Sequence, residues 1–436
     1  MATPRVDGPR VLRAVGTEGV PAATLRQDEL PAELRIVLST ASENSDLLKV
    51  ALAGGRERRD PKTGFKWDHL FLVSEREGAT PVLARQLSDL ERQGLSVPGG
   101  PDTLSRLQRL AMIRRFRLLE LDRRLDAFLD VLAAEGRSVV LLKGAALARS
   151  AYGSVVERPM ADVDLLVEKG TADAVWKLAA QAGWEPGRPD IPRSAYDDHH
   201  HLPPMTDSTG LGLGLEIHTE IFPERNPFRF SAADIWRRAR SLGRRGDHNR
   251  TGVLIPCPEH LLLHTALHFT WSHTFGFGVW KTFRDIHAVT SAETVDWDEL
   301  ARNARTSRGE TGLFWTLHLA RTWGGVALAE AFIDEMGGRV PRLLRTPLRR
   351  HFAIRLAPGR SAPPPIVVSQ RLWEMAMQPE RSGHGSIRPW DESEKWLGEA
   401  STEADSGSTR GPSVLGRYVK GALAGGRYLL RLLSRW

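Results

Sequence analysis

The stretch from Leu141 to Val167, LLKGAALARSAYGSVVERPMADVDLLV, constrains the fold more than any other part of the chain. Its first apolar run ends in Lys143 and Gly144, and the small residues that follow are typical of a short helix. Its last apolar run carries Asp162 and Asp164, which predicts a buried strand bearing two carboxylates. Because side chains alternate along a strand, both carboxylates face the same side of the sheet.

Carboxylates on a buried strand need a partner, because a buried charge is costly unless it is paired or binds a metal. We interpret Asp162 and Asp164 as ligands of a divalent metal, and a strand-end pair that caps a neighbouring helix is the alternative. The turn at Gly144 and Ala145 opens a helix, where backbone N–H groups can approach a phosphate. Lys143 either reaches a phosphate oxygen or extends its ammonium group from the strand end into solvent.

Three further residues belong to the same hypothesis. Arg158 precedes the two aspartates, where it either contacts a triphosphate or pairs with an aspartate. Glu216 and His218 share one face of a later strand. We expect Glu216 to be the third metal carboxylate or the base that deprotonates an acceptor hydroxyl. His218 is either a structural histidine or part of the pocket.

The run Asp197–His201, DDHHH, raises the question of a zinc site. We expect a strand from His199 to Met205, and adjacent histidines on a strand alternate faces, so at most two of them would share one metal. We therefore favour a role for His201 in shaping the nucleotide or acceptor pocket.

Helices after the sheet carry the remaining candidates. His264 and His268 have i, i+4 spacing, but the glutamate of an HExxH motif is missing, so we interpret them as core or pocket lining. Lys281 and Asp285 lie at the start of the next helix and are placed in a cleft that faces the sheet. His268, Lys281 and Asp285 are therefore pocket candidates.

The composition limits the class of protein. The chain has 436 residues, of which 41% are hydrophobic and 26% charged, as in a soluble globular protein. A single cysteine, Cys257, excludes a disulfide framework and a multi-thiolate zinc site and fits a cytoplasmic location. No signal peptide and no transmembrane segment is expected. The net charge of +7 helps to attract nucleoside triphosphates, and no DNA binding is expected.

The order of elements predicts an α+β fold, with a small mixed sheet flanked by N-terminal and C-terminal helical regions. We expect the last helix to pack on the helical domain rather than to touch an anionic membrane surface weakly, because Gly421, Gly425 and Gly426 weaken an isolated helix. The expected divisions are a flexible arm (1–33), a helical region (34–133), a catalytic domain (134–256) with a polar loop at 185–197, a helical domain (257–357), a linker (358–413) and a basic amphipathic helix (414–436).

The ordered motifs LLKGAAL, ERPMADVDLLV, HHHLPPM, LEIHTEI, PEHLLLHTALHFTWSH and KTFRDIHAV resemble a bacterial family of uncharacterised nucleotidyltransferases. That family belongs to the DNA polymerase beta-like nucleotidyltransferase superfamily, and the resemblance runs from about Leu34 to Trp323. It implies that Asp162, Asp164 and Glu216 are the catalytic metal carboxylates and that Gly144 starts the phosphate-binding turn. Ala145 departs from the superfamily, which usually has serine or glycine at this position.

The resemblance implies an Mg²⁺-dependent enzyme, with two ions and Mn²⁺ as the alternative. It would transfer a nucleoside monophosphate from a nucleoside triphosphate, ATP above the others, to a hydroxyl or similar acceptor and release pyrophosphate. The acceptor is left open between a small molecule, a peptide and a protein, in natural-product or polysaccharide biosynthesis. A protein-modifying AMP transferase and a non-catalytic nucleotide-binding regulatory protein are the alternatives.

Overall fold

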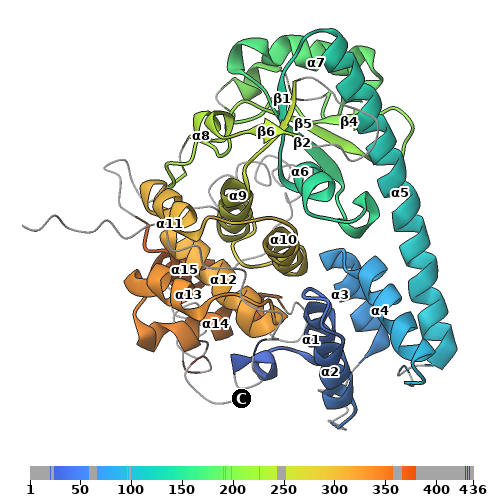
Figure 1. Cartoon of the computed structure of the whole chain (residues 1–436), viewed down its shortest axis with the longest axis vertical. Helices are drawn as coiled ribbons and strands as arrows, with labels where there is room; N and C mark the ends of the chain where they lie inside the picture. The colour runs from blue at the N-terminus through green and yellow to red at the C-terminus, as the bar shows by residue number, and fades with distance from the viewer. Residues whose placement is uncertain are drawn as a thin grey trace, which may run out of the picture.

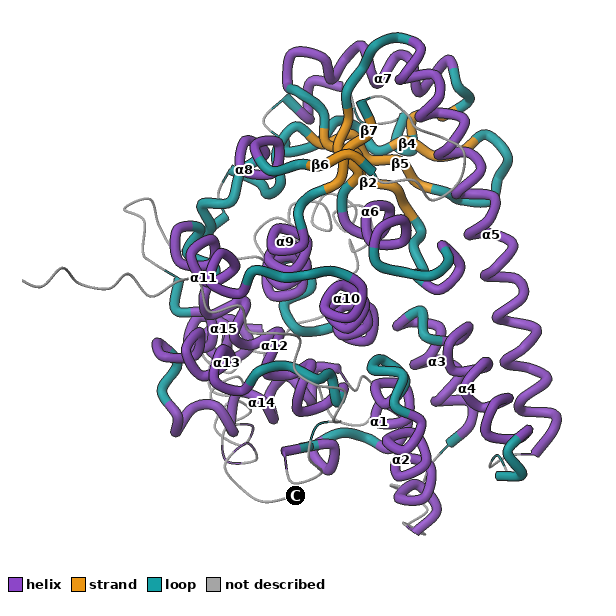
Figure 2. Tube along the Cα trace, viewed as in Figure 1, coloured by secondary structure: helices purple, strands orange, loops and turns teal. Residues whose placement is uncertain are grey.

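A mixed sheet lies at one end of the molecule and helices form the rest, as Figures 1 and 2 show. The structure is a computed structural model, and it confirms the predicted α+β fold with helical flanks. It describes residues 20, 24–57, 66–95, 97, 100–189, 191, 193–197, 199–224, 226–242, 252–356, 366–379, 428, 430 and 432.

The sheet has the strand order β3-β4-β5-β2-β1-β7-β6 among the described residues. β2 pairs in parallel with β5, and β1 pairs in parallel with β7, whereas the other neighbours are antiparallel. The central strands are apolar and buried, which places the core against them. The strands are β1 (Val139–Leu141), β2 (Asp162–Leu166), β3 (Trp184–Pro186), β4 (Met205–Asp207), β5 (Gly214–His218), β6 (Arg240–Ser241) and β7 (Val253–Ile255).

Short helices connect the strands. α6 (Lys143–Ser150) follows β1, and the 3-10 helix η3 (Val155–Glu157) leads into β2. α7 (Ala172–Gln181) follows β2, and α8 (Ala232–Arg237) lies beyond β5. The small residues of α6 are buried, so this helix packs closely on the sheet.

Among the described residues, five α-helices precede the sheet, and the last of them, α5, is long. α5 extends along one side of the molecule, from the level of α4 to the sheet (Figure 1). The described part of the predicted arm is packed, because Gln27 Nε2 donates a hydrogen bond of 2.8 Å to the Trp323 carbonyl. The elements are η2 (Gln27–Glu29), α1 (Ala32–Ser39), α2 (Ser45–Glu57), α3 (Trp67–Glu77), α4 (Thr80–Arg92) and α5 (Gly100–Ala134).

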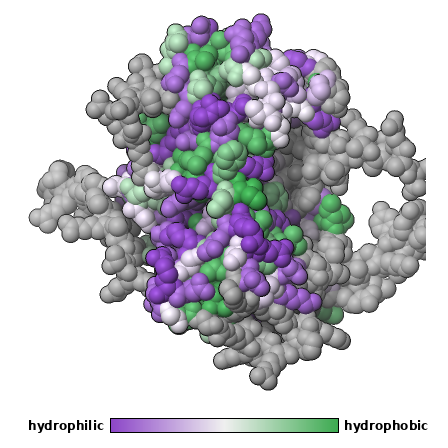
Figure 3. Space-filling view, turned by 90° about the vertical axis from the view of Figure 1, so that its right-hand side faces the viewer, coloured by the Kyte–Doolittle hydropathy of each residue, from purple (hydrophilic) through white to green (hydrophobic). Residues whose placement is uncertain are grey.

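The face in Figure 3, which contains α5, is mixed in character. Green apolar areas interrupt purple polar ones, and α5 exposes large apolar side chains there. Met112, Ile113, Phe116 and Leu119 are the exposed apolar residues of α5.

The helices after the sheet form a second core. In the part of this region that the structure describes, four tryptophans are fully buried: Trp280, Trp315, Trp323 and Trp373. Within the described residues, no helix is both long enough and apolar enough to cross a membrane. The helices are α9 (Pro258–Trp271), α10 (Val279–Ala292), α11 (Trp297–Thr306), α12 (Glu310–Gly324), α13 (Glu330–Met336), α14 (Arg342–Leu356) and α15 (Ile366–Met377).

Part of the predicted C-terminal helix contacts α14. His351 Nδ1 lies 2.7 Å from the Tyr428 hydroxyl, and Arg350 donates a 2.9 Å hydrogen bond to the Leu432 carbonyl. Of the linker predicted over 358–413, the structure describes residues 366–379, which contain the helix α15, and the rest lies outside the described residues.

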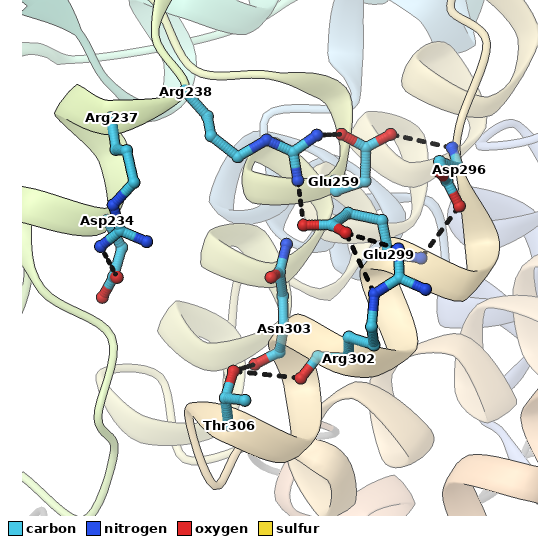
Figure 4. Close-up of polar contacts among 9 residues, drawn as sticks. All are labelled: Asp234, Arg237, Arg238, Glu259, Asp296, Glu299, Arg302, Asn303 and Thr306. Carbon is cyan, nitrogen blue, oxygen red and sulfur yellow. Dashed lines mark hydrogen bonds and ion pairs between the residues drawn. The ribbon is translucent and has the colours of Figure 1, made fainter.

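Charged side chains join α8 to the helices that follow the sheet (Figure 4). Arg238 lies 3.8 Å from Glu259 of α9 and forms a second ion pair with Glu299 of α11. Glu259 also accepts a hydrogen bond of 2.8 Å from the backbone N–H of Asp296, just before α11. The network therefore links the end of α8 to α9 and α11.

Two expectations for the sheet differ from the structure. The strand expected over residues 199–205 begins only at Met205, and His201 forms an isolated bridge with His218. The polar loop expected over 185–197 contains most of β3, because Trp184 is buried and starts a strand that pairs with β4.

Candidate active site

Two parallel strands bring the three predicted carboxylates to one face of the sheet. Asp164 of β2 lies opposite Glu216 of β5 in the strand register. Asp162 lies two residues before Asp164 and therefore points to the same side. Asp164 is only 3% exposed, whereas Asp162 is exposed and Glu216 is half-buried. These three side chains, which we call the carboxylate wall, extend from the buried Asp164 to the exposed Asp162, where the group is open to solvent.

Lys143 places a positive charge at this wall. Its Nζ lies 2.7 Å from Asp164 Oδ1, and its backbone φ is +42°, a conformation that few residues with a side chain adopt. The next residue has to be small, because a Cβ on Gly144 would lie 3.2 Å from both Arg158 Nη1 and Met160 Cβ. The β1–α6 turn therefore brings the lysine to the carboxylates.

His218 bridges two of the carboxylates. Its Nε2 lies 2.9 Å from Asp164 Oδ1 and 3.3 Å from Glu216 Oε2. Burial alone would lower the pKa of His218, but its hydrogen bonds to Asp164 and Glu216 outweigh that effect and raise the pKa above 6.5. This shift favours a proton on His218, which together with the Lys143 ammonium offsets the negative charge of the carboxylates. His218 would release that proton on binding a metal.

The two aspartates have opposite pKa shifts. Burial would raise the pKa of Asp164, but the Lys143 ammonium and the His218 hydrogen bond hold it well below its usual value. The pKa of Asp162 is raised by desolvation and by the charge of Asp164. Asp164 is thus the fully ionised anchor of the site, and Asp162 is the group whose charge is least compensated.

Arg158 forms a buried ion pair with α10. Its Nε lies 2.6 Å from Asp285 Oδ1 and its Nη2 lies 2.8 Å from Asp285 Oδ2. Tyr152 donates a hydrogen bond of 2.7 Å from its hydroxyl to Asp285 Oδ1. Of the two roles expected for Arg158, the structure shows pairing with an aspartate, and that aspartate is Asp285 rather than a metal-ligand candidate.

Lys281 lies one helical turn before Asp285 and is half-buried. Burial and the charge of Arg158 lower the pKa of Lys281, while Asp162 and Asp285 oppose this shift. Within the described residues, Lys281 has no ion pair or hydrogen bond. Its ammonium therefore remains available to an anionic ligand near Asp162.

Two histidines of α9, His264 and His268, lie near the site, and His273 follows the helix. The ring of His268 lies 6.3 Å from that of His264 and 4.6 Å from that of His273. Burial and the positive charge of Lys143 lower the pKa of His264 to about 3 and that of His268 well below its usual value. These neutral imidazoles are close enough to Lys143 to feel its charge.

His201 contacts the site through His218. It forms an isolated antiparallel bridge with His218, and the two rings are 5.4 Å apart. Its Nδ1 lies 2.7 Å from the Leu202 carbonyl. Asp197 forms a 2.9 Å ion pair with Arg193, and Asp198 lies outside the described residues.

A family model described as uncharacterised nucleotidyltransferase matches residues 63–325, which is more than half of the chain. The chain belongs to this family. Comparison with curated proteins and with solved structures gave no significant match. The membership confirms the family that the motifs predict, and the matched segment contains every candidate residue described above.

The residues present fit the divalent metal that nucleotidyltransferases generally use. Asp164, Glu216 and His218 each offer a ligand atom, and these atoms lie within 4.8 Å of one another. Carboxylate oxygens are preferred by Mg²⁺ and Mn²⁺. The Lys143 ammonium beside Asp164 shows that this position favours a positive charge. Asp162, on the same face, would complete the set of carboxylates.

Ala145, where the superfamily usually has a serine or a glycine, is 1% exposed and belongs to the core. Ala145 has no hydroxyl, so a phosphate at the β1–α6 turn would be bound by the first backbone N–H groups of α6 and by Lys143 and Lys281. The sequence identified Asp285 as a pocket candidate but predicted neither its pairing with Arg158 nor the role of Tyr152. Near Arg158 the sequence offered only one hint of this contact, the aromatic Tyr152 before Gly153. Asp285 lies on α10, far along the chain, so no local pattern connects it to Arg158.

Proposed function

We propose that this nucleotidyltransferase moves a nucleoside monophosphate from ATP to a hydroxyl or similar acceptor and releases pyrophosphate. The observation that supports the proposal best is the convergence of Asp162, Asp164 and Glu216 on one face of β2 and β5, beside the turn that begins α6. A metal bound by these carboxylates would supply positive charge to the phosphates.

The residues around the carboxylates suit a triphosphate. The first N–H groups of α6 have no partner within the helix, and a helix N-terminus favours an anion. Lys281 adds an ammonium without a partner among the described residues near Asp162. The Arg158–Asp285 pair holds α10, which carries Lys281, against the loop before β2. In this proposal Lys281 stabilises the charge that develops on the leaving pyrophosphate.

The acceptor would approach from the side of Glu216. The bond between the acceptor oxygen and the α-phosphorus forms while the bond to the pyrophosphate oxygen breaks. The acceptor proton passes to the Glu216 carboxylate, which is 26% exposed, whereas Asp164 is closed off by Lys143 and His218. The neutral His268 and His201 rings would line the pocket for the acceptor or the base.

The test uses ATP labelled at the α-phosphorus, Mg²⁺, and two acceptor pools, the small-molecule and the protein fraction of a cell extract. The expected result is transfer of label together with an equal amount of pyrophosphate. The double variant Asp162→Asn/Asp164→Asn should transfer none. Asp46→Asn, whose carboxylate is 83% exposed on α2, is the matched control and should act as the unchanged chain does.

The location of the label separates the alternatives. Label in the protein fraction would favour a protein-modifying AMP transferase over small-molecule transfer. Binding of ATP without transfer to either pool, with or without Mn²⁺, would contradict the proposal and favour a regulatory nucleotide-binding protein. The other nucleoside triphosphates, tested by competition with labelled ATP, check the choice of base.

A further inference from the structure

Three consecutive histidines, His199, His200 and His201, form a group beside the carboxylate wall. Each offers a ring nitrogen, and these nitrogens lie within 4.8 Å of one another. The ring of His201 lies 5.6 Å from that of His199 and 4.6 Å from that of His200. All three side chains are half-buried, so the group is held by the protein and still open to solvent.

The backbone explains how neighbouring histidines can point to one place. Residues 199 and 200 are in bends and only His201 forms a bridge, so the alternation of a strand does not apply. The bends are fixed, because the carbonyl of His200 accepts hydrogen bonds from the N–H groups of Thr219 at 2.9 Å and Glu220 at 3.1 Å. The side chains are thus brought together by a defined turn and not by a mobile loop.

Hydrogen bonding prepares two of the rings for a ligand. His201 Nδ1 lies 2.7 Å from the Leu202 carbonyl, which can only accept, so Nδ1 carries the proton and Nε2 carries a free lone pair. A backbone carbonyl behind a metal-binding imidazole is the usual arrangement in metalloproteins. His200 Nδ1 is buried and has no hydrogen-bond partner among the described residues.

The charge state agrees with this geometry. Burial and the positive charge of neighbouring groups, foremost His218, lower the pKa values of His200 and His201. A neutral imidazole is the form that binds a metal.

We propose that His199, His200 and His201 bind one transition-metal ion of the zinc class through three imidazole nitrogens. A tetrahedral ion with Zn–N bonds of about 2.0–2.1 Å needs its ligand nitrogens about 3.4 Å apart. The three ring nitrogens already lie within 4.8 Å of one another, so small side-chain rotations suffice to bring them to that spacing. Three imidazoles select zinc, cobalt or nickel, whereas the neighbouring carboxylates select Mg²⁺ or Mn²⁺. The fourth position of the ion remains open to water or to a donor atom of a ligand.

The zinc-class site does not rest on the proposed transfer reaction. It depends only on the histidine segment and its hydrogen bonds, and it is tested without any turnover. A failure of the transfer assay would leave it unaffected, and a failure to bind zinc would leave the carboxylate wall unaffected.

The test uses the full chain, cleared of metal, in millimolar Mg²⁺ so that the carboxylates are occupied. Co²⁺ is added as the probe, and Zn²⁺ affinity is measured by its competition with Co²⁺. The expected result is one Co²⁺ per chain, with the visible absorption of a four-coordinate ion. The metal-edge X-ray absorption of the Zn²⁺ form should show three imidazole ligands.

Variants locate the ion. His199→Ala and His201→Ala should each weaken Zn²⁺ binding by about 100-fold or more, because removal of a mere second-shell partner already costs about 10–100-fold. His69→Ala on α3 is the control, and its affinity should equal that of the unchanged chain. Circular dichroism confirms that each variant is folded.

Three results would overturn the site. The first is the absence of a four-coordinate Co²⁺ spectrum in the unchanged chain. The second is an X-ray absorption spectrum with one imidazole and mainly oxygen ligands, which would assign the ion to Asp164, Glu216 and His218. The third is full affinity in a folded His199→Ala/His201→Ala double variant. The first two need no variant, so they decide the question even where a substitution prevents folding.

Discussion

The carboxylate wall and the histidine group lie side by side but are built in different ways. Asp164 and Glu216 are neighbours because two regular strands pair in register. His199, His200 and His201 are neighbours because the chain bends between the 3-10 helix η5 (Arg193–Tyr196) and β4. In a regular strand the direction of each side chain follows from its spacing in the sequence. In a bend, neighbouring side chains can point to one place although the alternation of a strand would separate them.

In the two regions, the surroundings shift the pKa of histidine in opposite directions. His218 is buried between carboxylates, whose hydrogen bonds raise its pKa. His200 is half-buried, and desolvation and the positive charge of His218 lower its pKa. Burial acts against the charged form in both cases, and the nearest charges decide the outcome.

The largest effect is expected from the carboxylates. Asp162→Asn/Asp164→Asn should reduce nucleotidyl transfer by about 1,000-fold or more, because the phosphates lose the charge that stabilises the transition state. The same variant should keep the Co²⁺ spectrum of the histidine group. Label transfer and visible absorption on one sample measure both. Loss of both signals in a folded variant would mean that the two regions form one site.

A smaller effect is expected from the ion pair that holds α10. Asp285→Asn should lower the free energy of unfolding by about 3–5 kcal/mol, because the buried guanidinium of Arg158 loses its counter-charge. Adding Arg158→Met should recover part of the stability, since no unpaired charge remains. Urea denaturation measures this.

Lys49→Met is the control, because its pair with Asp46 is exposed and should be worth less than about 1 kcal/mol. If Asp285→Asn were as mild as that control, α10 would not be anchored by this pair.

The smallest effect concerns a buried histidine far from both regions. Burial and the charge of Arg355 lower the pKa of His351 from 6.5 to about 3. Below pH 6.5 the unfolded chain binds a proton that the folded chain does not, so stability is lost as the pH falls towards 3. At pH 5 this amounts to about 2 kcal/mol.

His351→Gln should therefore lose about 2 kcal/mol less stability between pH 7 and pH 5 than the unchanged chain does. Urea denaturation at the two pH values measures the difference. Equal losses in both proteins would show that His351 is protonated in the folded state.

Much of the fold and part of the site could be predicted from the sequence. Apolar runs and period-two spacing predicted β1, β2 and β5, and the same spacing placed Asp162 and Asp164 on one side. A helical domain after the sheet was also predicted, over residues 257–357. The strand pattern and the family resemblance both identified Glu216 as a candidate carboxylate, but the register that puts it opposite Asp164 appears only in the structure.

The remaining features depend on contacts between distant segments. Arg158 and Asp285 are 127 residues apart, and nothing in the local pattern of either one identifies the other. β3 was missed because its three residues include a proline and a glutamate, and only its pairing with β4 makes it a strand. The bends at His199 and His200 likewise depend on hydrogen bonds from Thr219 and Glu220, which follow β5.

The Arg158–Asp285 contact also determines how the molecule can be divided. Asp285 accepts hydrogen bonds from both Arg158 and Tyr152, and all three side chains are buried. A fragment that ended after β7 would keep every predicted metal carboxylate but would leave a guanidinium and a phenol without their acceptor. The sheet is therefore a poor module for transplantation, and a chimera with another family member should exchange the segment from Tyr152 to Asp285 as one block.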